Sequence, residues 1–171
     1  MAKLCEGSLA TKGIITDFIS LKERRLDAFD AHSVYDSKNY RELTDLVAAA
    51  QGLVLASPIY NWGFSSELKK FIEYVGSTDD ARTTPLFDKT ISLVGAAGLP
   101  HSYMAFGSLA NSLMMDFKCI INPYMIYVHN RHWEGEILVN EASERVEKAM
   151  FVMVELTQLL QHRTYRSQWE I

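Results

Sequence analysis

The residues best placed for chemistry lie between Leu53 and Gly76, in the stretch LVLASPIYNWGFSSELKKFIEYVG. A short apolar run leads into a turn with two large aromatic residues, Tyr60 and Trp62, and then into a helical pattern. Gly63 allows a ligand to approach the backbone closely, and free N–H groups in such a turn could bind the polar edge of a flat heterocycle. An equally plain interpretation is a strand-to-helix connection whose aromatic residues pack on a neighbouring subunit.

A second loop of this kind, in LVGAAGLPHSYMAF, follows another apolar run. Gly95 and Gly98 permit a tight backbone there, and His101 stands where the next helical pattern begins. An imidazole titrates near neutral pH and could hydrogen-bond a ligand. The cap preference of short polar residues favours the alternative that His101 or Ser102 only caps the helix.

The elements that must position these loops follow from the hydrophobic periodicity. It predicts strands at 14–21, 52–56, 90–94 and 119–128, and helices at 40–51, 65–75, 101–115 and 141–160. Alternating strands and helices are typical of an α/β fold with a doubly wound parallel sheet covered on both faces. Ligands of such sheets bind beyond the carboxyl ends of the strands, where both loops lie. Pro58 should end its strand, and Pro123 should place the last strand at an edge or a bulge.

Composition limits the remaining function classes. The 171 residues are 48% apolar and 22% charged, which is enough for one globular domain over residues 1–171. A net charge of −4 argues against a nucleic-acid or polybasic membrane partner, and no apolar run approaches the length of a membrane span. Cys5 and Cys119 form neither a disulfide framework nor a zinc pattern, so we expect a cytoplasmic protein without a metal site.

The stretch SPIYNWGFSSELKKFIEY resembles the signature T/S-P-x-Y-N-x-x-x-x-x-x-L-K-x-x-I-D/E of the NADPH-dependent FMN reductases, which have a flavodoxin-like fold. The resemblance rests on Ser57, Pro58, Tyr60, Asn61, Leu68, Lys69, Ile72 and Glu73. It implies a loop that lies against the flavin of FMN, with contacts from Pro58, Ile59, Tyr60, Asn61, Trp62 and Gly63. It also implies that the second loop flanks the flavin through Ala97, Gly98 and His101. Ile59 stands where the family often has an acidic residue.

The activity that the resemblance implies is hydride transfer from NAD(P)H to FMN, and from there to free FMN, a quinone or a similar acceptor. We expect no catalytic side chain, because the cofactor carries the chemistry. The family is commonly dimeric or tetrameric, which implies a homodimer or homotetramer here. Arg82 and Arg131 are candidates for binding the 2′-phosphate of NADPH. Two alternatives remain: a flavodoxin-like electron carrier, and a non-catalytic remnant that has lost the binding of the FMN phosphate.

The beginning of the sequence departs from the family. Flavodoxin-like domains open with a strand and a phosphate-binding loop, whereas residues 1–12 are typical of the end of a first helix, with Gly13 as its stop. We therefore expect an N-terminally truncated domain whose first strand is absent, by about 25–30 residues. The predicted strand 14–21 would then pair directly with 52–57, detach, or leave a gap that another chain fills.

Other conspicuous side chains receive plain structural interpretations. Lys22–Arg25 is a solvated loop, and Lys69 and Lys70 pair with Glu73 on one helix face. The histidines after the last strand, three residues apart, are surface residues without a third metal ligand. The aromatic and basic tail HRTYRSQWEI could dock on a partner subunit.

Overall fold

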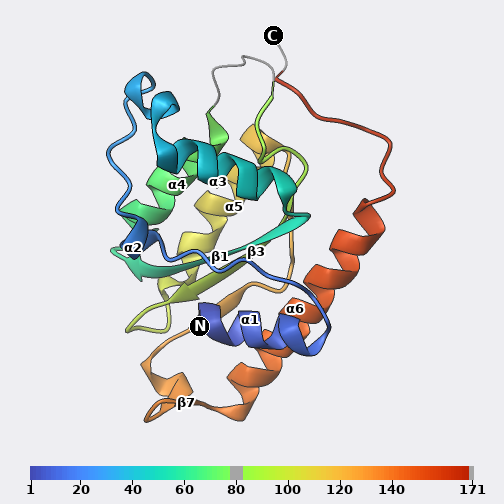
Figure 1. Ribbon diagram of the computed structural model, residues 1–171. Helices are drawn as coiled ribbons and strands as arrows, with labels where there is room; N and C mark the ends of the chain where they lie inside the picture. The colour runs from blue at the N-terminus through green and yellow to red at the C-terminus, as the bar shows by residue number, and fades with distance from the viewer. Residues whose placement is uncertain (78–82, 170–171) are drawn as a thin grey trace.

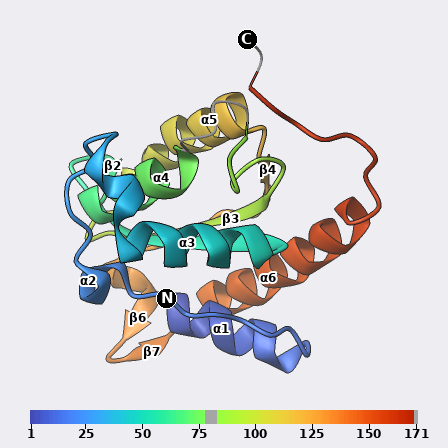
Figure 2. The same cartoon turned by 45° about the horizontal axis from the view of Figure 1, so that its top comes forward.

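A mostly parallel sheet separates two layers of helices in the computed structural model, which describes residues 1–77 and 83–169 (Figures 1 and 2). One layer consists of α3 (Lys38–Ala49), α4 (Ser66–Gly76) and α5 (Ala105–Phe117), preceded by the short helices α2 (Leu21–Arg24) and η1 (Ser33–Asp36). The other layer consists of α1 (Ala2–Thr11) and α6 (Asn140–Leu160). The α/β architecture predicted from alternating elements is confirmed.

The centre of the sheet is β3 (Thr90–Ala96), which is buried at six of its seven positions. Its parallel neighbour β1 (Gly52–Tyr60) pairs with it from Gly52 opposite Thr90 to Pro58 opposite Ala96. On the other side, β4 (Ile120–Ile121) and β5 (Ile126–Val128) pair with the two ends of β3. The carboxyl ends of β1, β3 and β5 therefore lie at one edge of the sheet.

The core on the α3–α4–α5 face explains two of the local sequence choices. A Cβ added at Gly95 would lie 2.6 Å from Cδ1 of Ile59 and 3.0 Å from Cζ of Phe106, so a larger residue there would force these side chains to move. The sequence predicts a cap for α4 at Ser65 or Ser66, and Ser65 forms it by accepting the N–H of Leu68 at 3.4 Å. The N–H of Ser65 in turn donates to the hydroxyl of Ser57 at 3.0 Å, which joins the end of β1 to the start of α4.

The predicted strand at 14–21 is wrong. Residues 14–20 are extended but pair with no strand in the described structure, and Leu21 begins α2. Ile14 packs against the core below α1 and α6, whereas Ile19 packs against the core of the opposite face, and Ile15 between them is 97% exposed. The segment thus crosses from one face of the sheet to the other past the outer edge of β1, so its backbone cannot follow that strand.

Two predicted strands differ in length from the observed ones. β1 continues through Pro58 to Tyr60, so the prediction that Pro58 ends this strand is wrong. A proline lacks only the backbone N–H, and on the outer side of β1 no strand among the described residues would accept a hydrogen bond from it. The predicted strand 119–128 is divided into β4 and β5. Among the described residues both pair with β3 alone, which confirms the edge position predicted from Pro123. At the break the buried side-chain amide of Asn122 donates to Ser92 Oγ and to the carbonyl of Ala149, both at 2.8 Å.

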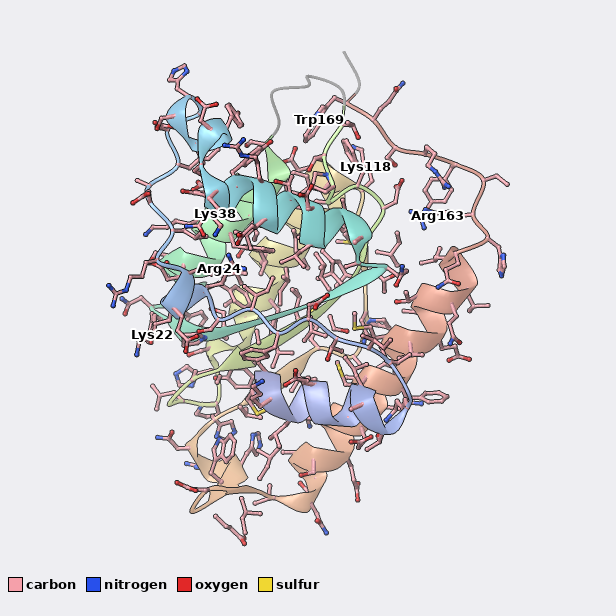
Figure 3. The ribbon with its side chains drawn as sticks, viewed as in Figure 1. Lys22, Arg24, Lys38, Lys118, Arg163 and Trp169 are labelled. Carbon is pink, nitrogen blue, oxygen red and sulfur yellow. The ribbon has the colours of Figure 1, made fainter. Side chains whose placement is uncertain are left out.

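The tail after α6 returns to the opposite face of the sheet and packs on its own chain (Figure 3). The ring centroid of Trp169 lies 4.8 Å from that of Phe87 and 5.9 Å from that of Phe117. Ser167 donates to the Asp88 carboxylate from its N–H at 2.9 Å and from its hydroxyl at 2.5 Å. Ser167 and Trp169 of the tail are therefore held by contacts within their own chain.

The described part of the chain contains no helix with the length and apolar character that a membrane crossing requires.

Candidate functional site

The first candidate loop is a tight hairpin, which the sequence analysis did not predict. Tyr60 at the end of β1 pairs antiparallel with Gly63 of β2 (Gly63–Phe64), and only Asn61 and Trp62 lie between them. Their φ angles of 49° and 64° are those of a type I′ turn. Such turns favour Asn followed by Gly, so the tryptophan at the second position hides the signal.

Trp62 is strained in this turn. A left-handed backbone costs a non-glycine residue about 1–2 kcal/mol, and a bulky side chain is rare there. The indole is nevertheless 54% exposed, so burial of the ring does not offset this cost. Backbone strain that is not compensated by packing is a sign of a functional site.

The hairpin turn and the loop after β3 meet through their rings. The indole of Trp62 and the imidazole of His101 have centroids 5.9 Å apart, with their planes inclined by 37°. His101 lies just before the short helix η2 (Ser102–Met104), and its side chain makes no capping hydrogen bond. The interpretation of His101 or Ser102 as a side-chain cap for the helix is therefore wrong, and α5 itself begins only at Ala105.

Exposed apolar side chains lie in the same two loops as this ring pair. We call this group the carboxyl-edge patch, and it consists of Tyr60, Trp62, Leu99, Tyr103 and Met104. Each of the five side chains is between 54% and 65% exposed. Large apolar residues gathered at the carboxyl ends of parallel strands are typical of a ligand site or a subunit interface.

Two backbone donors of the hairpin turn are free in the described part of the chain. Within the described residues, the N–H groups of Asn61 and Trp62 donate to no backbone or side-chain acceptor. The N–H of Ala97, by contrast, donates to the carbonyl of Val128 at 3.0 Å. The hairpin turn therefore offers donors to a ligand, and Ala97 does not.

The remaining predicted contact residues divide by the direction of their side chains. Pro58 and Tyr60 are exposed, but Ile59 is buried in the core, so it could offer a ligand only its backbone. Gly63 and Gly98 have room for a Cβ, whose nearest neighbours would be 3.6 Å and 3.8 Å away. Packing within the chain does not require glycine at these two positions.

A third segment completes this edge of the sheet. After β5, η3 (Asn130–His132) lies beside the loop after β3, and Nδ2 of Asn130 is the atom nearest to a Cβ added at Gly98. Tyr127 of β5 donates its hydroxyl to the carbonyl of Leu99. The chain then turns away through a small hairpin of β6 (Trp133–Glu134) and β7 (Ile137–Leu138).

The two histidines of this segment cap it reciprocally. Nδ1 of His129 accepts the N–H of Arg131, and Nδ1 of His132 accepts the N–H of His129, each at 3.3 Å. Their rings are 4.0 Å apart, and partial burial, followed by the nearness of His132 and Arg131, lowers the pKa of His129. No cluster of three metal-ligating side chains occurs in residues 1–77 and 83–169. The three-residue spacing of His129 and His132 is that of a capping box, which was not predicted from the sequence.

The charge at this edge contrasts with that of the whole chain. The segments 57–66, 96–104 and 126–133 contain no Asp or Glu, although the protein has a net charge of −4. They do contain Arg131. An edge of this kind suits an electron-rich or anionic ligand. The other predicted candidate for a phosphate, Arg82, lies outside the described residues.

Comparison with known proteins agrees with this geometry. The family model described as NADPH-dependent FMN reductase matches residues 1–132. No sequence among the curated proteins matches the chain.

Solved structures share the fold at low sequence identity. FerB, an NAD(P)H:acceptor oxidoreductase and flavoenzyme from Paracoccus denitrificans, is 14% identical with a TM-score of 0.74, covering 92% of this chain and 87% of its own. An oxidoreductase from Corynebacterium diphtheriae is 15% identical with a TM-score of 0.69, covering 92% and 85%. The apo form of EMOB, an NADH:FMN oxidoreductase, is 16% identical with a TM-score of 0.66, covering 90% and 81%.

Proposed function

Because this chain belongs to the NADPH-dependent FMN reductase family, we propose that it binds FMN at the carboxyl-edge patch. We further propose that it passes hydride from NAD(P)H to a flat acceptor such as free flavin or a quinone. The observation that carries the proposal is Trp62, a strained and exposed indole held beside His101. A ring held at that energetic cost is suited to cover a planar ligand.

The residues present fit FMN on observations of this structure. The unpartnered N–H groups of Asn61 and Trp62 suit the carbonyl and nitrogen acceptors along one side of an isoalloxazine. The rings of Tyr60 and Trp62 provide flat apolar area, and no carboxylate in the three loops would repel an electron-rich ring. Gly63 and Gly98 leave space for close approach from two sides.

The chain's own residues orient the ligands and exclude water. When bound, FMN supplies the hydride chemistry, and we assign no catalytic side chain. Asn61 and Trp62 would fix the ring edge through their backbone, and the indole would exclude water from one side. Arg131 would favour nucleotides and acceptors with negative charge at the rim, and His101 would support the indole of Trp62 through their ring contact. Pro58 and Ile59 would contribute as the rigid end of β1, and Ala97 as support of the second loop.

The same patch supports a homodimer or homotetramer. Five large apolar side chains more than half exposed at one edge are costly to leave in water. A second subunit covering part of this edge would bury them and enclose the ligand. The sedimentation behaviour of the chain with and without FMN tests this part of the proposal.

The proposed activity is tested by titrating FMN into the purified chain and following flavin fluorescence, then measuring NADPH and NADH oxidation with free FMN or a quinone. Trp62→Ala should weaken FMN binding at least tenfold. Phe151→Ala is the matched control, because Phe151 is 52% exposed on α6 and should leave binding unchanged.

The outcomes separate the alternatives. Flavin binding without NAD(P)H oxidation would identify an electron carrier in place of an oxidoreductase. Failure to bind FMN under any condition would overturn the proposal and favour a binding module without catalysis. If Trp62→Ala and Phe151→Ala change the FMN affinity equally, the flavin does not bind at the carboxyl-edge patch.

A further inference from the structure

A basic hollow lies between α2 and the first two turns of α4. Its volume is about 330 Å³, and it is lined by Lys22, Arg25, Leu26, Glu67 and Lys70. We call it the α2–α4 pocket. Its size falls at the lower end of the range of small-ligand sites. Two of its cations come from the stretch Lys22–Arg25, which the sequence predicts as a solvated loop but which forms most of α2 and its C-terminal end.

Two of the cations in the pocket are unused. In the described structure the side chains of Lys22 and Arg25 form no hydrogen bond and no ion pair, whereas Arg24 between them pairs with Glu42. Lys70 is held in place, because its Nζ donates to the carbonyl of Leu26 at 3.0 Å.

The carboxylate in the pocket leaves the positive charge in excess. Glu67 lies 3.2 Å from Lys70 Nζ, so Lys70 pairs with Glu67 and not with Glu73 as its spacing had suggested. Lys69 alone pairs with Glu73, at 3.1 Å. Three cations therefore face one carboxylate in the α2–α4 pocket, and two of the three have no compensating partner.

The backbone at Arg25 adds a second observation. Arg25 ends α2 with φ 49° and ψ 59°, a left-handed conformation in which glycine or asparagine is favoured. Capping the helix therefore does not explain the arginine side chain. As at Trp62, a large residue occupies a position where a small one would be less strained, and its side chain is directed to a site instead of to the core.

The pocket lies close to the proposed flavin edge. α4 begins two residues after Phe64 of the hairpin. Glu67 and Lys70 therefore lie in the first two turns of the helix that follows the Trp62 hairpin. Figure 3 labels Lys22 and Arg24 at α2, on the side of the molecule where β1 ends.

We propose that the α2–α4 pocket binds the phosphate monoester of a nucleotide ligand whose ring lies at the carboxyl-edge patch. A phosphate dianion satisfies two free cations through charge-assisted hydrogen bonds, and the fork of Arg25 matches its oxygens. The choice of ligand rests on the proposed function, which supplies two sources of this group: the 5′-phosphate of FMN and the 2′-phosphate of NADPH.

The test compares the double variant Lys22→Gln/Arg25→Gln with Lys118→Gln/Lys148→Gln. The control pair removes the same charge, and Lys118 also has a left-handed backbone, with φ 54°, at the end of α5. Three quantities are measured for each protein: the affinity for inorganic pyrophosphate by calorimetry, the FMN-to-riboflavin affinity ratio, and the NADPH-to-NADH ratio of kcat/KM.

We expect the pocket variant to lose at least tenfold in pyrophosphate affinity, while the control variant stays within twofold of the wild type. A matching fall in the FMN-to-riboflavin ratio identifies the flavin phosphate as the natural occupant. A fall in the NADPH-to-NADH ratio identifies the 2′-phosphate. Glu67→Gln should act in the opposite direction and strengthen pyrophosphate binding several-fold, because it removes the one carboxylate.

The proposal is overturned if all three quantities are the same in the pocket and control variants. A chain that binds no flavin and oxidises no NAD(P)H, yet binds pyrophosphate through Lys22 and Arg25, would overturn the proposed function and leave the pocket intact. If the chain binds flavin but neither double variant changes its FMN-to-riboflavin or NADPH-to-NADH ratio, the phosphate site is overturned and the proposed function stands.

Discussion

Trp62 and His101 lie 39 positions apart in the sequence, and their rings are in contact with centroids 5.9 Å apart. Each belongs to the turn that follows one of two paired parallel strands, and the register of β1 on β3 brings the turns together. The contact is made from a backbone that Trp62 adopts at a cost. The carboxyl edge is thus organised around a strained residue, which has a measurable consequence.

We predict that Trp62→Gly makes the protein more stable by about 1 kcal/mol, because glycine removes the left-handed strain. Trp62→Ala keeps the strain and loses the ring, so it should not stabilise. Urea unfolding of the three proteins measures the difference. Equal stability of the glycine and alanine variants would show that the turn is not strained.

Asn122 should be among the most sensitive polar positions of the core. Its buried side-chain amide forms hydrogen bonds with Ser92 Oγ, the carbonyl of Ala149 and the N–H of Tyr124 at the break between β4 and β5. Asn122→Ala leaves these three groups without a hydrogen-bond partner from residue 122. We expect a loss of about 2–3 kcal/mol in unfolding free energy. Asn111→Ala on the exposed side of α5 is the control and should change stability by less than about 0.5 kcal/mol.

The two cysteines should be unreactive in the folded protein. Burial raises the pKa of Cys5 to about 11 and that of Cys119 to about 12, so almost no thiolate exists at pH 8. A colourimetric disulfide reagent should detect no thiol within minutes in native buffer, and two thiols per chain in denaturant. A rapid native reaction of either thiol would contradict this.

Stability should fall on mild acidification through His129. Its pKa is lowered in the folded state, so the unfolded chain binds more protons as the pH drops through its ordinary value of 6.5. The contribution of neutral His129 to the unfolding free energy is complete above pH 6.5. It is lost as the pH falls through the lower pKa of His129 in the folded protein. His129→Asn keeps an acceptor for the N–H of Arg131 but does not titrate. Unfolding free energies between pH 8 and 5 should therefore fall more steeply for the wild type, and parallel profiles would contradict the prediction.

The sequence was sufficient for the elements that bury a continuous apolar face. β3 and the helices from 38 to 49 and from 66 to 76 follow the hydrophobic period within about two residues. A serine cap before the second of these helices is predictable because the hydroxyl binds backbone close in sequence, although the pattern does not distinguish Ser65 from Ser66. The motif around Pro58 and Asn61 then identified which strand end matters.

Tertiary context decided what the sequence could not show. The stretch from Ile14 has the apolar residues of a strand, but it divides them between two cores and crosses the sheet. The type I′ turn was concealed because Trp62 stands where glycine is expected. The α2–α4 pocket depends on a contact between Lys70 and Leu26, 44 residues apart, which no periodicity reveals.

The tail that ends at Trp169 has a consequence for how the molecule comes apart. Its residues are continuous with α6 on one face of the sheet, but the indole is held between Phe87 and Phe117 on the other. Separating α6 from the sheet therefore requires extracting Trp169 from the opposite layer, which makes the two layers unfold as one cooperative unit. A single proteolytic cut between Arg163 and Arg166 would divide that unit, and hydrogen exchange would then report two opening free energies in place of one.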